Sequence, residues 1–217
     1  MGELILVRHG QASFGTDDYD RLSAQGFEQG RLLGRYLRER GLGFDRVIRG
    51  SLRRHQETLA AMEVPGAPEV LPALNEFDFY AVVNCYLRQH PDHPAIDFAN
   101  VRDFFLTLRK AVPLWSEGGL VEPPEPWSVF ESRIKAVLAE LIASEGRVLV
   151  VSSGGPISAL LREVLQLSVR TMFDLNLQCA NTSLTRLQFK NGKARLQSFN
   201  GVPHLDHADA SHLITLT

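Results

Sequence analysis

Short runs of consecutive apolar residues predict the strands of a buried sheet, because they are too short for helices and lack a polar face. Strands are predicted on this basis at residues 4–7, 45–50, 70–71 and 147–152, and the apolar centre of the second is Val47-Ile48. Further along the chain, two more apolar segments flank Asn191-Gly192, a dipeptide typical of type I′ turns. The sequence therefore predicts an antiparallel hairpin with strands at 184–189 and 194–199.

Apolar residues spaced three or four apart predict helices between the strands. We expect Ser23 to cap a first helix that ends near Gly41, and Ser51 to cap a second helix that runs through Met62. Further helices are expected at 129–144 and 157–165. Strands that alternate with helices predict an α/β protein, a three-layer α/β/α sandwich whose sheet is mostly parallel with one antiparallel hairpin.

Residues 77–127 differ from the rest, since they are rich in aromatic residues and proline and contain no strand pattern. We interpret this stretch, called the lid segment below, as a helical insertion into a single domain that spans residues 1–217. Its aromatic residues are expected to form the core of the lid rather than a stacking surface. The chain from residue 205 onward is expected to be a loosely held tail.

Composition narrows the function classes. Of 217 residues, 44% are hydrophobic and 22% are charged, with a formal net charge of -2, so nothing favours nucleic acid or an anionic membrane as a partner. No apolar run is long enough to span a membrane, and no secretory signal is evident. The two distant cysteines, Cys85 and Cys179, suit a reducing compartment, which favours a cytoplasmic protein.

Polar residues follow three predicted strands at the edge where ligands bind in α/β sheets. Arg8-His9-Gly10 follows the first strand, Arg53-Arg54 follows the second, and Ser153-Gly154 follows the strand at 147–152. Guanidinium groups and helix N-termini bind phosphoryl oxygens, and a neutral imidazole is a good nucleophile. The sequence thus predicts a metal-independent phosphate site, with Glu76 or the nearby Asp78 as the acid that protonates a leaving oxygen.

Each of these residues also has a purely structural interpretation. His9 could bind backbone at a strand end, and Arg8 and Arg54 could form surface ion pairs. Glu76 and Ser153 could each cap a helix. Arg53 is interpreted as a solvated helix residue.

The ordered motifs resemble those of the histidine phosphatase superfamily, which includes cofactor-dependent phosphoglycerate mutases and many phosphatases. Residues 6–10, 50–58, 74–76 and 150–155 resemble its motifs in the family's order. The resemblance implies a phosphoglycerate mutase-like fold and a phosphohistidine on His9. It also implies phosphate binding by Arg8, Gly10, Arg54, Ser153 and Gly154, with Glu76 as the general acid and no cofactor. Arg54 is preferred to Arg53 because it precedes Thr58 by four residues.

Two departures from the family pattern bear on the activity. Ser153 stands where the family usually has a second catalytic histidine, and Gly15 stands where mutases carry an asparagine. We therefore expect a phosphatase for a small phosphorylated substrate, weakened or specialised by Ser153. A mutase and a catalytically impaired phospho-ligand-binding protein are the alternatives, and a homodimer is left open. Four histidines could replace the absent imidazole from elsewhere: His55, His90, His93 and His204.

Overall fold

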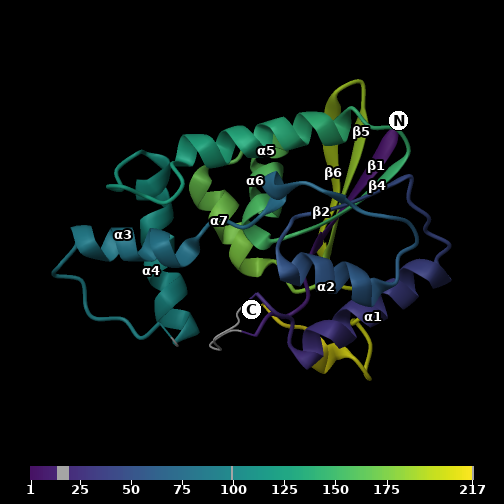
Figure 1. The fold of residues 1–217 in the computed structure, drawn as a ribbon, viewed down its shortest axis with the longest axis horizontal. Coiled ribbons are helices and arrows are strands. Elements are labelled where there is room, and N and C mark those ends of the chain that lie inside the picture. Colours follow the sequence, from purple (N-terminus) through teal and green to yellow (C-terminus); the bar gives the residue numbers. More distant parts are fainter. Residues whose placement is uncertain (14–19, 99, 217) are drawn as a thin grey trace.

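The computed structural model describes residues 1–13, 20–98 and 100–216, and Gly15 lies outside them. Its centre is a six-stranded sheet with the order β3-β2-β4-β1-β5-β6 (Figure 1). The strands are β1 (Gly2–Arg8), β2 (Arg46–Arg49), β3 (Glu69–Val70), β4 (Arg147–Ser152), β5 (Leu184–Lys190) and β6 (Lys193–Gly201). The first four strands are parallel, whereas β5 runs antiparallel to both β1 and β6.

Helices cover both faces of this sheet, which confirms the predicted three-layer architecture. They are α1 (Ala24–Glu39), α2 (Arg53–Met62), α3 (Phe79–Gln89), α4 (Val101–Ser116), α5 (Trp127–Ile142), α6 (Gly154–Leu165) and α7 (Val169–Gln178). Two short 3₁₀ turns, η1 (Pro72–Leu74) and η2 (Ser211–Leu213), complete the secondary structure of the described residues. In Figure 1, α1 and α2 lie on one side of the sheet, and α5, α6 and α7 lie on the other.

Side-chain alternation along β1 explains why both faces are covered. Leu4 and Leu6 belong to the core under α5 and α6, whereas Ile5 and Val7 belong to the core under α1 and α2. All four side chains are buried. Since neighbouring strand residues point to opposite faces, a continuous apolar run requires helices on both sides.

The local sequence signals were confirmed at most element ends. The Ser23 side chain accepts a hydrogen bond from the Gly26 amide and caps α1. Asn191 and Gly192 both have positive φ angles, 52° and 70°, as a type I′ turn requires. The expected Ser51 cap was wrong, because Leu52 occupies the cap position of α2 without a side-chain hydrogen bond.

Helices α3 and α4 lie within the lid segment, next to one end of α5 (Figure 1). Their attachment is aromatic: the Trp115 ring lies 5.0 Å from the Phe77 ring and 5.4 Å from the Phe130 ring, centroid to centroid. The Trp115 indole donates a hydrogen bond of 2.8 Å to the Glu125 carbonyl. These contacts join the lid segment to α5 through a dry aromatic cluster.

The C-terminal segment is bound to the rest of the molecule, so the expectation of a loosely held tail was wrong. Leu205 and Ala210 are buried against α1. The Gln29 amide donates to the Leu213 carbonyl at 2.7 Å, and the Asn181 backbone donates to the Thr215 carbonyl at 2.8 Å. The sequence pattern gave no sign of these bonds, because their acceptors are backbone carbonyls, which every residue carries.

Among the described residues, no helix is both long enough and apolar enough to cross a membrane.

The contact between α1 and α2 depends on Gly34. A Cβ atom at this position would lie 1.9 Å from the Met62 carbonyl oxygen, so α1 would have to move away from α2. We expect Gly34→Ala to lower the free energy of unfolding by about 1–3 kcal/mol, the usual cost of overpacking. Urea denaturation measures this difference.

Gly43→Ala is the matched control, because a Cβ there meets no atom within 4 Å. Its unfolding midpoint should stay close to that of the wild type. Equal midpoints for the two variants would contradict the proposed packing constraint.

Candidate functional site

The parallel pairing of β1 with β4 builds the base of the site. Arg8 is the register partner of Ser152, and the His9 amide donates a hydrogen bond of 2.9 Å to the Ser152 carbonyl. Strand β2 pairs with the other edge of β4, so α2 also starts at this edge of the sheet. Three strand ends therefore meet here, as the sequence predicted.

His9 lies at the centre of this edge. Its Nδ1 lies 2.7 Å from the Gly10 carbonyl oxygen, an acceptor, so Nδ1 carries the proton and Nε2 keeps its lone pair in the neutral ring. Burial lowers the pKa of His9 well below 6.5, and the positive charges of Arg54 and Arg8 lower it further. The imidazole is thus neutral near pH 7, and its Nε2 can act as a nucleophile.

Gly10 is held in place by close packing against α1 and by a hydrogen bond to α2. A Cβ on Gly10 would lie 2.5 Å from the Gly26 carbonyl oxygen, so only glycine allows α1 to approach this closely. The Gly10 amide donates to the Thr58 hydroxyl at 2.9 Å. The Thr58 hydroxyl in turn donates to the Arg54 carbonyl at 2.6 Å. These bonds connect the end of β1 to the first turn of α2.

Arg54 is buried beside His9, with 5% of its surface exposed. Its Nη1 lies 2.7 Å from the Asp20 carboxylate. Arg53 points elsewhere and forms an exposed ion pair with Glu57 at 2.6 Å, in agreement with its interpretation as a solvated helix residue. The structure thus places Arg54, and not Arg53, against the histidine.

The Arg8 guanidinium binds backbone carbonyls. Its Nη1 donates to the Leu216 carbonyl at 2.8 Å and also to the Cys179 carbonyl. Within the described residues, no carboxylate pairs with Arg8, so the surface ion pair considered above is absent there.

Glu76 reaches the site because the chain around it is anchored. The Arg133 guanidinium donates to the carbonyls of Ala73 and Asn75 at 2.6 and 2.8 Å, and the Ser152 hydroxyl donates to the Leu74 carbonyl at 2.7 Å. The carboxylate itself accepts a hydrogen bond of 3.0 Å from the Gly155 amide.

Burial raises the pKa of Glu76 above its usual value, although the Gly155 hydrogen bond and the charge of Arg54 oppose this effect. Asp78, the other candidate acid, is exposed and accepts a hydrogen bond from the Ala81 amide, which makes it the cap of α3. Of the two carboxylates, only Glu76 borders the cavity described below.

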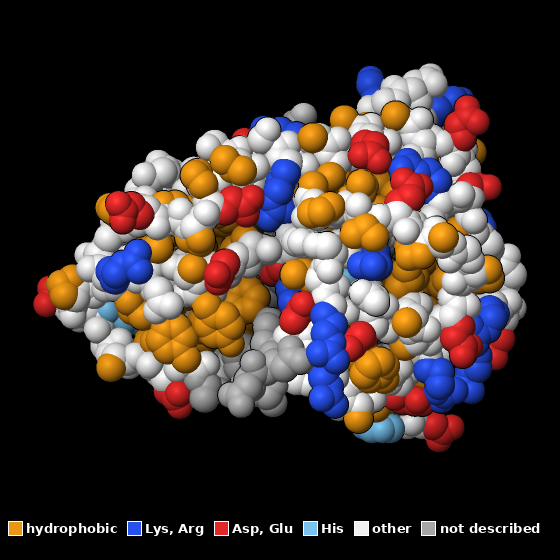
Figure 2. All heavy atoms as spheres, in the orientation of Figure 1, with side chains coloured by type: hydrophobic (Ala, Val, Ile, Leu, Met, Phe, Trp, Pro, Cys, Tyr) orange, Lys and Arg blue, Asp and Glu red, His pale blue; other side chains and the backbone are white. Residues whose placement is uncertain are grey.

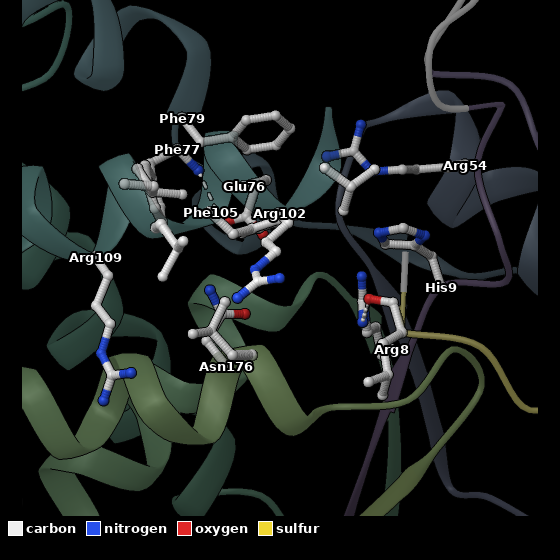
Figure 3. A pocket seen from close by; sticks show the side chains of 15 residues that line it. Arg8, His9, Arg54, Glu76, Phe77, Phe79, Arg102, Phe105, Arg109 and Asn176 are labelled. Carbon is white, nitrogen blue, oxygen red and sulfur yellow. Dashed lines mark hydrogen bonds between the residues drawn. The ribbon is translucent and has the colours of Figure 1, made fainter. Parts of the chain in front are cut away.

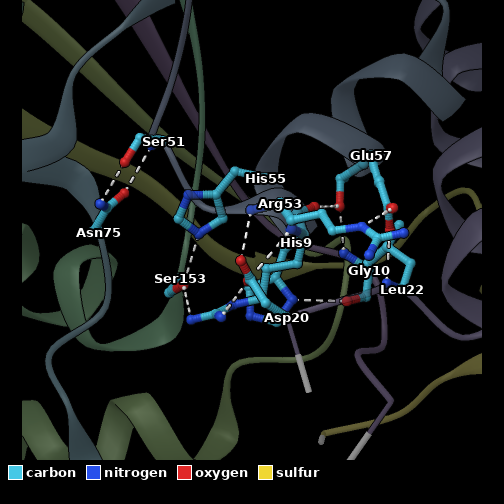
Figure 4. Close-up of polar contacts among 12 residues, drawn as sticks. His9, Gly10, Asp20, Leu22, Ser51, Arg53, His55, Glu57, Asn75 and Ser153 are labelled. Carbon is cyan, nitrogen blue, oxygen red and sulfur yellow. Dashed lines mark hydrogen bonds and ion pairs between the residues drawn. The ribbon is translucent and has the colours of Figure 1, made fainter. Parts of the chain in front are cut away.

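Ser153 occupies the cap position of α6, but its side chain forms no cap hydrogen bond. The residue is fully buried, and its hydroxyl oxygen lies 2.8 Å from His55 Nε2 and 3.4 Å from Arg54 Nη2 (Figure 4). The neighbouring Gly154 packs against Asn176, since a Cβ there would lie 2.2 Å from the amide oxygen.

Of the four histidines named above, only His55 lies beside Ser153. Its ring centroid is 5.8 Å from that of His9. His90 and His93 lie at the end of α3 and just beyond it, bonded to the carbonyls of Tyr86 and Pro94. His204 is buried elsewhere, 2.9 Å from the Thr182 hydroxyl.

A cavity of about 310 Å³ opens in front of His9 (Figure 3). Its polar end is formed by Arg8, His9, Arg54 and Glu76. The rest of the wall comes from the lid segment, α7 and the C-terminal segment. Its residues are Phe77, Phe79, Val101, Arg102, Phe105, Leu106, Leu108, Arg109, Asn176, Leu177 and Leu216. Figure 2 shows hydrophobic side chains gathered over α3 and α4 on the outer surface as well.

Sequence reasoning missed several of these wall residues. Helix α7 was not predicted, although Ser168 caps it through the Thr171 amide and gave a usable signal. Arg102 and Arg109 also border the cavity, and no motif in the sequence marks them. Phe105 also borders the cavity, so the aromatic residues of the lid segment do more than fill its core.

No group of three or more His, Cys, Asp or Glu side chains in the described part of the chain is arranged to hold a metal ion.

Comparisons with known proteins agree with this geometry. The family model of the histidine phosphatase superfamily (branch 1) matches residues 4–201. A 2,3-bisphosphoglycerate-dependent phosphoglycerate mutase of Parvibaculum lavamentivorans is 26% identical over 207 residues, which cover 88% of this chain and 93% of that protein.

Two solved structures share the fold. A phosphoserine phosphatase of Entamoeba histolytica, solved with 3-phosphoglyceric acid, superposes with a TM-score of 0.67 at 20% identity, covering 94% of this chain and 100% of the other. A mycobacterial glucosyl-3-phosphoglycerate phosphatase superposes with a TM-score of 0.63 at 23% identity, covering 93% of this chain and 99% of the other. The chain thus shares the α/β fold of these two structures. By its family match, the chain belongs to the histidine phosphatase superfamily.

The position of Arg54 predicts how the site binds an anion. We expect Arg54→Ala to weaken the binding of inorganic phosphate about 10-fold to 100-fold, because a hydrogen bond to a charged group contributes about 1.5–3 kcal/mol. Isothermal titration calorimetry measures the dissociation constant.

Arg53→Ala removes an equal charge one residue away and is the matched control, with phosphate affinity expected to stay within twofold. If both variants bind phosphate equally well, the anion does not bind at Arg54.

Proposed function

We propose that the protein is a phosphatase that hydrolyses a small phosphomonoester through a phosphohistidine on His9. The observation that carries the proposal is the polar end of the cavity. There a neutral imidazole with a free Nε2 lies between two guanidinium groups and borders the same space as the half-buried carboxyl group of Glu76. Membership of the histidine phosphatase superfamily and the phosphatases among the structural neighbours support it.

The first step is transfer of the phosphoryl group to the enzyme. The His9 Nε2 lone pair forms a bond to phosphorus while the bond from phosphorus to the ester oxygen breaks. The protonated Glu76 gives its proton to the departing oxygen, so the leaving group departs as an alcohol. Arg8 and Arg54 stabilise the charge on the phosphoryl oxygens.

The second step releases phosphate. A water molecule attacks phosphorus and gives a proton to the Glu76 carboxylate, while the bond between phosphorus and Nε2 breaks. Inorganic phosphate leaves, and Glu76 is again protonated for the next cycle. Burial raises the pKa of Glu76, which favours the protonated form that the first step needs.

A mutase of the same chemistry is the second candidate, favoured by the Parvibaculum relative. It would return the phosphoryl group to another position of the same substrate. The walls of the cavity favour the phosphatase, because a mutase for a sugar acid needs polar groups for the substrate body, and most of the wall residues here are apolar.

The same walls suggest the class of ester. Phe79, Phe105 and Leu177 border the cavity, and Leu106 borders it while half of its own surface is exposed to solvent. A cavity of about 310 Å³ has room for a phosphate with one compact apolar group. We propose that the substrate carries a ring or a short hydrocarbon body, and that the lid segment selects it.

Substitution of the nucleophile tests the proposed reaction. We expect His9→Ala to reduce the hydrolysis of p-nitrophenyl phosphate to the background rate, since no other group replaces Nε2. The wild type should trap an acid-labile, base-stable phosphoenzyme, and the variant should not.

His93→Ala, in the lid segment, should retain activity. A wild type as inert as His9→Ala on a broad panel of phosphate esters would refute the phosphatase and leave a ligand-binding protein.

The two carboxylates near the site give the next prediction. We expect Glu76→Gln to slow hydrolysis of benzyl phosphate by about 10²–10⁴-fold, the usual contribution of a general acid. The effect on p-nitrophenyl phosphate should be smaller, because nitrophenolate leaves without a proton. Steady-state kinetics measure both rates.

Asp78→Asn is the matched control and should change neither rate by more than twofold. A larger loss for Asp78→Asn than for Glu76→Gln would reverse the assignment.

Substrate choice is tested with two esters of similar leaving-group chemistry. We expect kcat/KM for benzyl phosphate to exceed that for glycerol 3-phosphate about 10-fold to 100-fold, because burial of a ring contributes about 1.5–3 kcal/mol. Phe105→Ala should reduce this preference. Equal or higher kcat/KM for glycerol 3-phosphate would contradict the apolar substrate.

A further inference from the structure

His55 is a buried histidine that the proposed reaction does not use. It lies in the first turn of α2, next to Arg54, and none of its surface is exposed. One nitrogen, Nε2, lies 2.8 Å from the Ser153 hydroxyl oxygen. The other, Nδ1, has no hydrogen-bond partner among the described residues. Buried polar atoms are normally hydrogen-bonded, and here a buried imidazole bonds a buried hydroxyl next to His9 and Arg54.

The Ser153 hydroxyl is the partner that holds the His55 ring. The edge of the ring that carries Nδ1 packs on Gly50, where an added Cβ would lie 2.2 Å from Nδ1. Either tautomer of His55 forms the bond to Ser153. Nε2 donates to the hydroxyl oxygen when Nε2 carries the proton, and it accepts from the hydroxyl when Nδ1 carries the proton.

The Ser153 hydroxyl connects His55 to the anion site. Its oxygen also lies 3.4 Å from Arg54 Nη2, and Asp20 holds Nη1 at the other side of the same guanidinium (Figure 4). The planar guanidinium is thus bonded at both Nη atoms, to the charged Asp20 carboxylate and to the neutral Ser153 hydroxyl. Without the His55 bond, the Ser153 hydroxyl could rotate and give its own proton elsewhere.

We propose that His55 is a positioning residue of the phosphate site, which fixes the Ser153 hydroxyl through Nε2 and thereby orients the Arg54 guanidinium toward His9. The catalytic part of this inference rests on the proposed function, and the orientation of Arg54 does not. The pair acts as one unit, so neither member is sufficient without the other.

His55→Phe tests the inference, because it keeps a ring of similar size and removes the nitrogen that bonds Ser153. We expect kcat to fall about 10-fold to 100-fold with a smaller change in KM, since small displacements of catalytic groups have effects of this size. His55→Gln places an amide N–H near the position of Nε2 and should restore much of kcat.

Ser153→Ala and the double variant form a mutant cycle with His55→Phe. Because His55 acts through Ser153, the double variant should be no slower than the slower single variant. Effects that multiply would overturn the inference. Ser153→His should lower kcat, because the larger side chain must displace His55 from its buried position. A rise in kcat would instead show that serine merely weakens the site.

His204→Phe is the control for loss of a buried imidazole–hydroxyl bond, since His204 lies 2.9 Å from the Thr182 hydroxyl. It should lower the melting temperature about as much as His55→Phe while kcat stays within twofold. Equal losses of kcat in both variants would reduce the role of His55 to general stability and overturn the inference.

Calorimetric binding of inorganic phosphate separates this inference from the proposed function. His55→Phe should weaken phosphate binding even if the wild type hydrolyses no ester, in which case the proposed reaction fails and the positioning role stands. Hydrolysis by the wild type with unchanged kcat and unchanged phosphate affinity in His55→Phe would overturn the positioning role alone.

Discussion

The parallel hydrogen bonds between β1 and β4 are the constraint on which the rest of the site depends. The two strands pair as far as Arg8 and Ser152. One further hydrogen bond follows, which the His9 amide donates to the Ser152 carbonyl. This last bond places His9 next to Ser153, although the two residues lie far apart in the sequence. A shift of the register by one residue would turn these side chains to opposite faces of the sheet.

The site also concentrates positive charge in a region with little water. Arg54 is buried, Arg8 is half-buried, and His9 lies between them. Burial keeps the imidazole neutral, and the charges of Arg54 and Arg8 add to this effect, so the groups proposed to bind an anion also help to preserve the proposed nucleophile. Asp20 offsets part of this charge through its ion pair with Arg54, which also borders the cavity.

The structural features that depend on local sequence pattern were predictable. The strand runs, the Asn191-Gly192 turn and the ordered motifs around His9, Arg54 and Glu76 led to the fold and to one edge of the sheet. The sequence could not predict contacts made by backbone carbonyls, such as those from Arg8 to the C-terminal segment. Nor could it choose His55 among four histidines, because the His55 contacts with Ser153 and Gly50 join residues that are separated in the sequence and meet only in the folded chain.

Three buried histidines also make the fold sensitive to acid. Burial lowers the pKa of His9 and of His55 well below 6.5, and lowers that of His204 to about 4. Below about pH 6.5 these histidines bind protons in the unfolded chain but stay neutral in the folded chain. The free energy of unfolding therefore decreases as the pH falls. Each such histidine lowers the free energy of unfolding by up to about 1.4 kcal/mol for each pH unit. The neutral ring on which the proposed phosphate chemistry depends thus also makes the folded state less stable in acid.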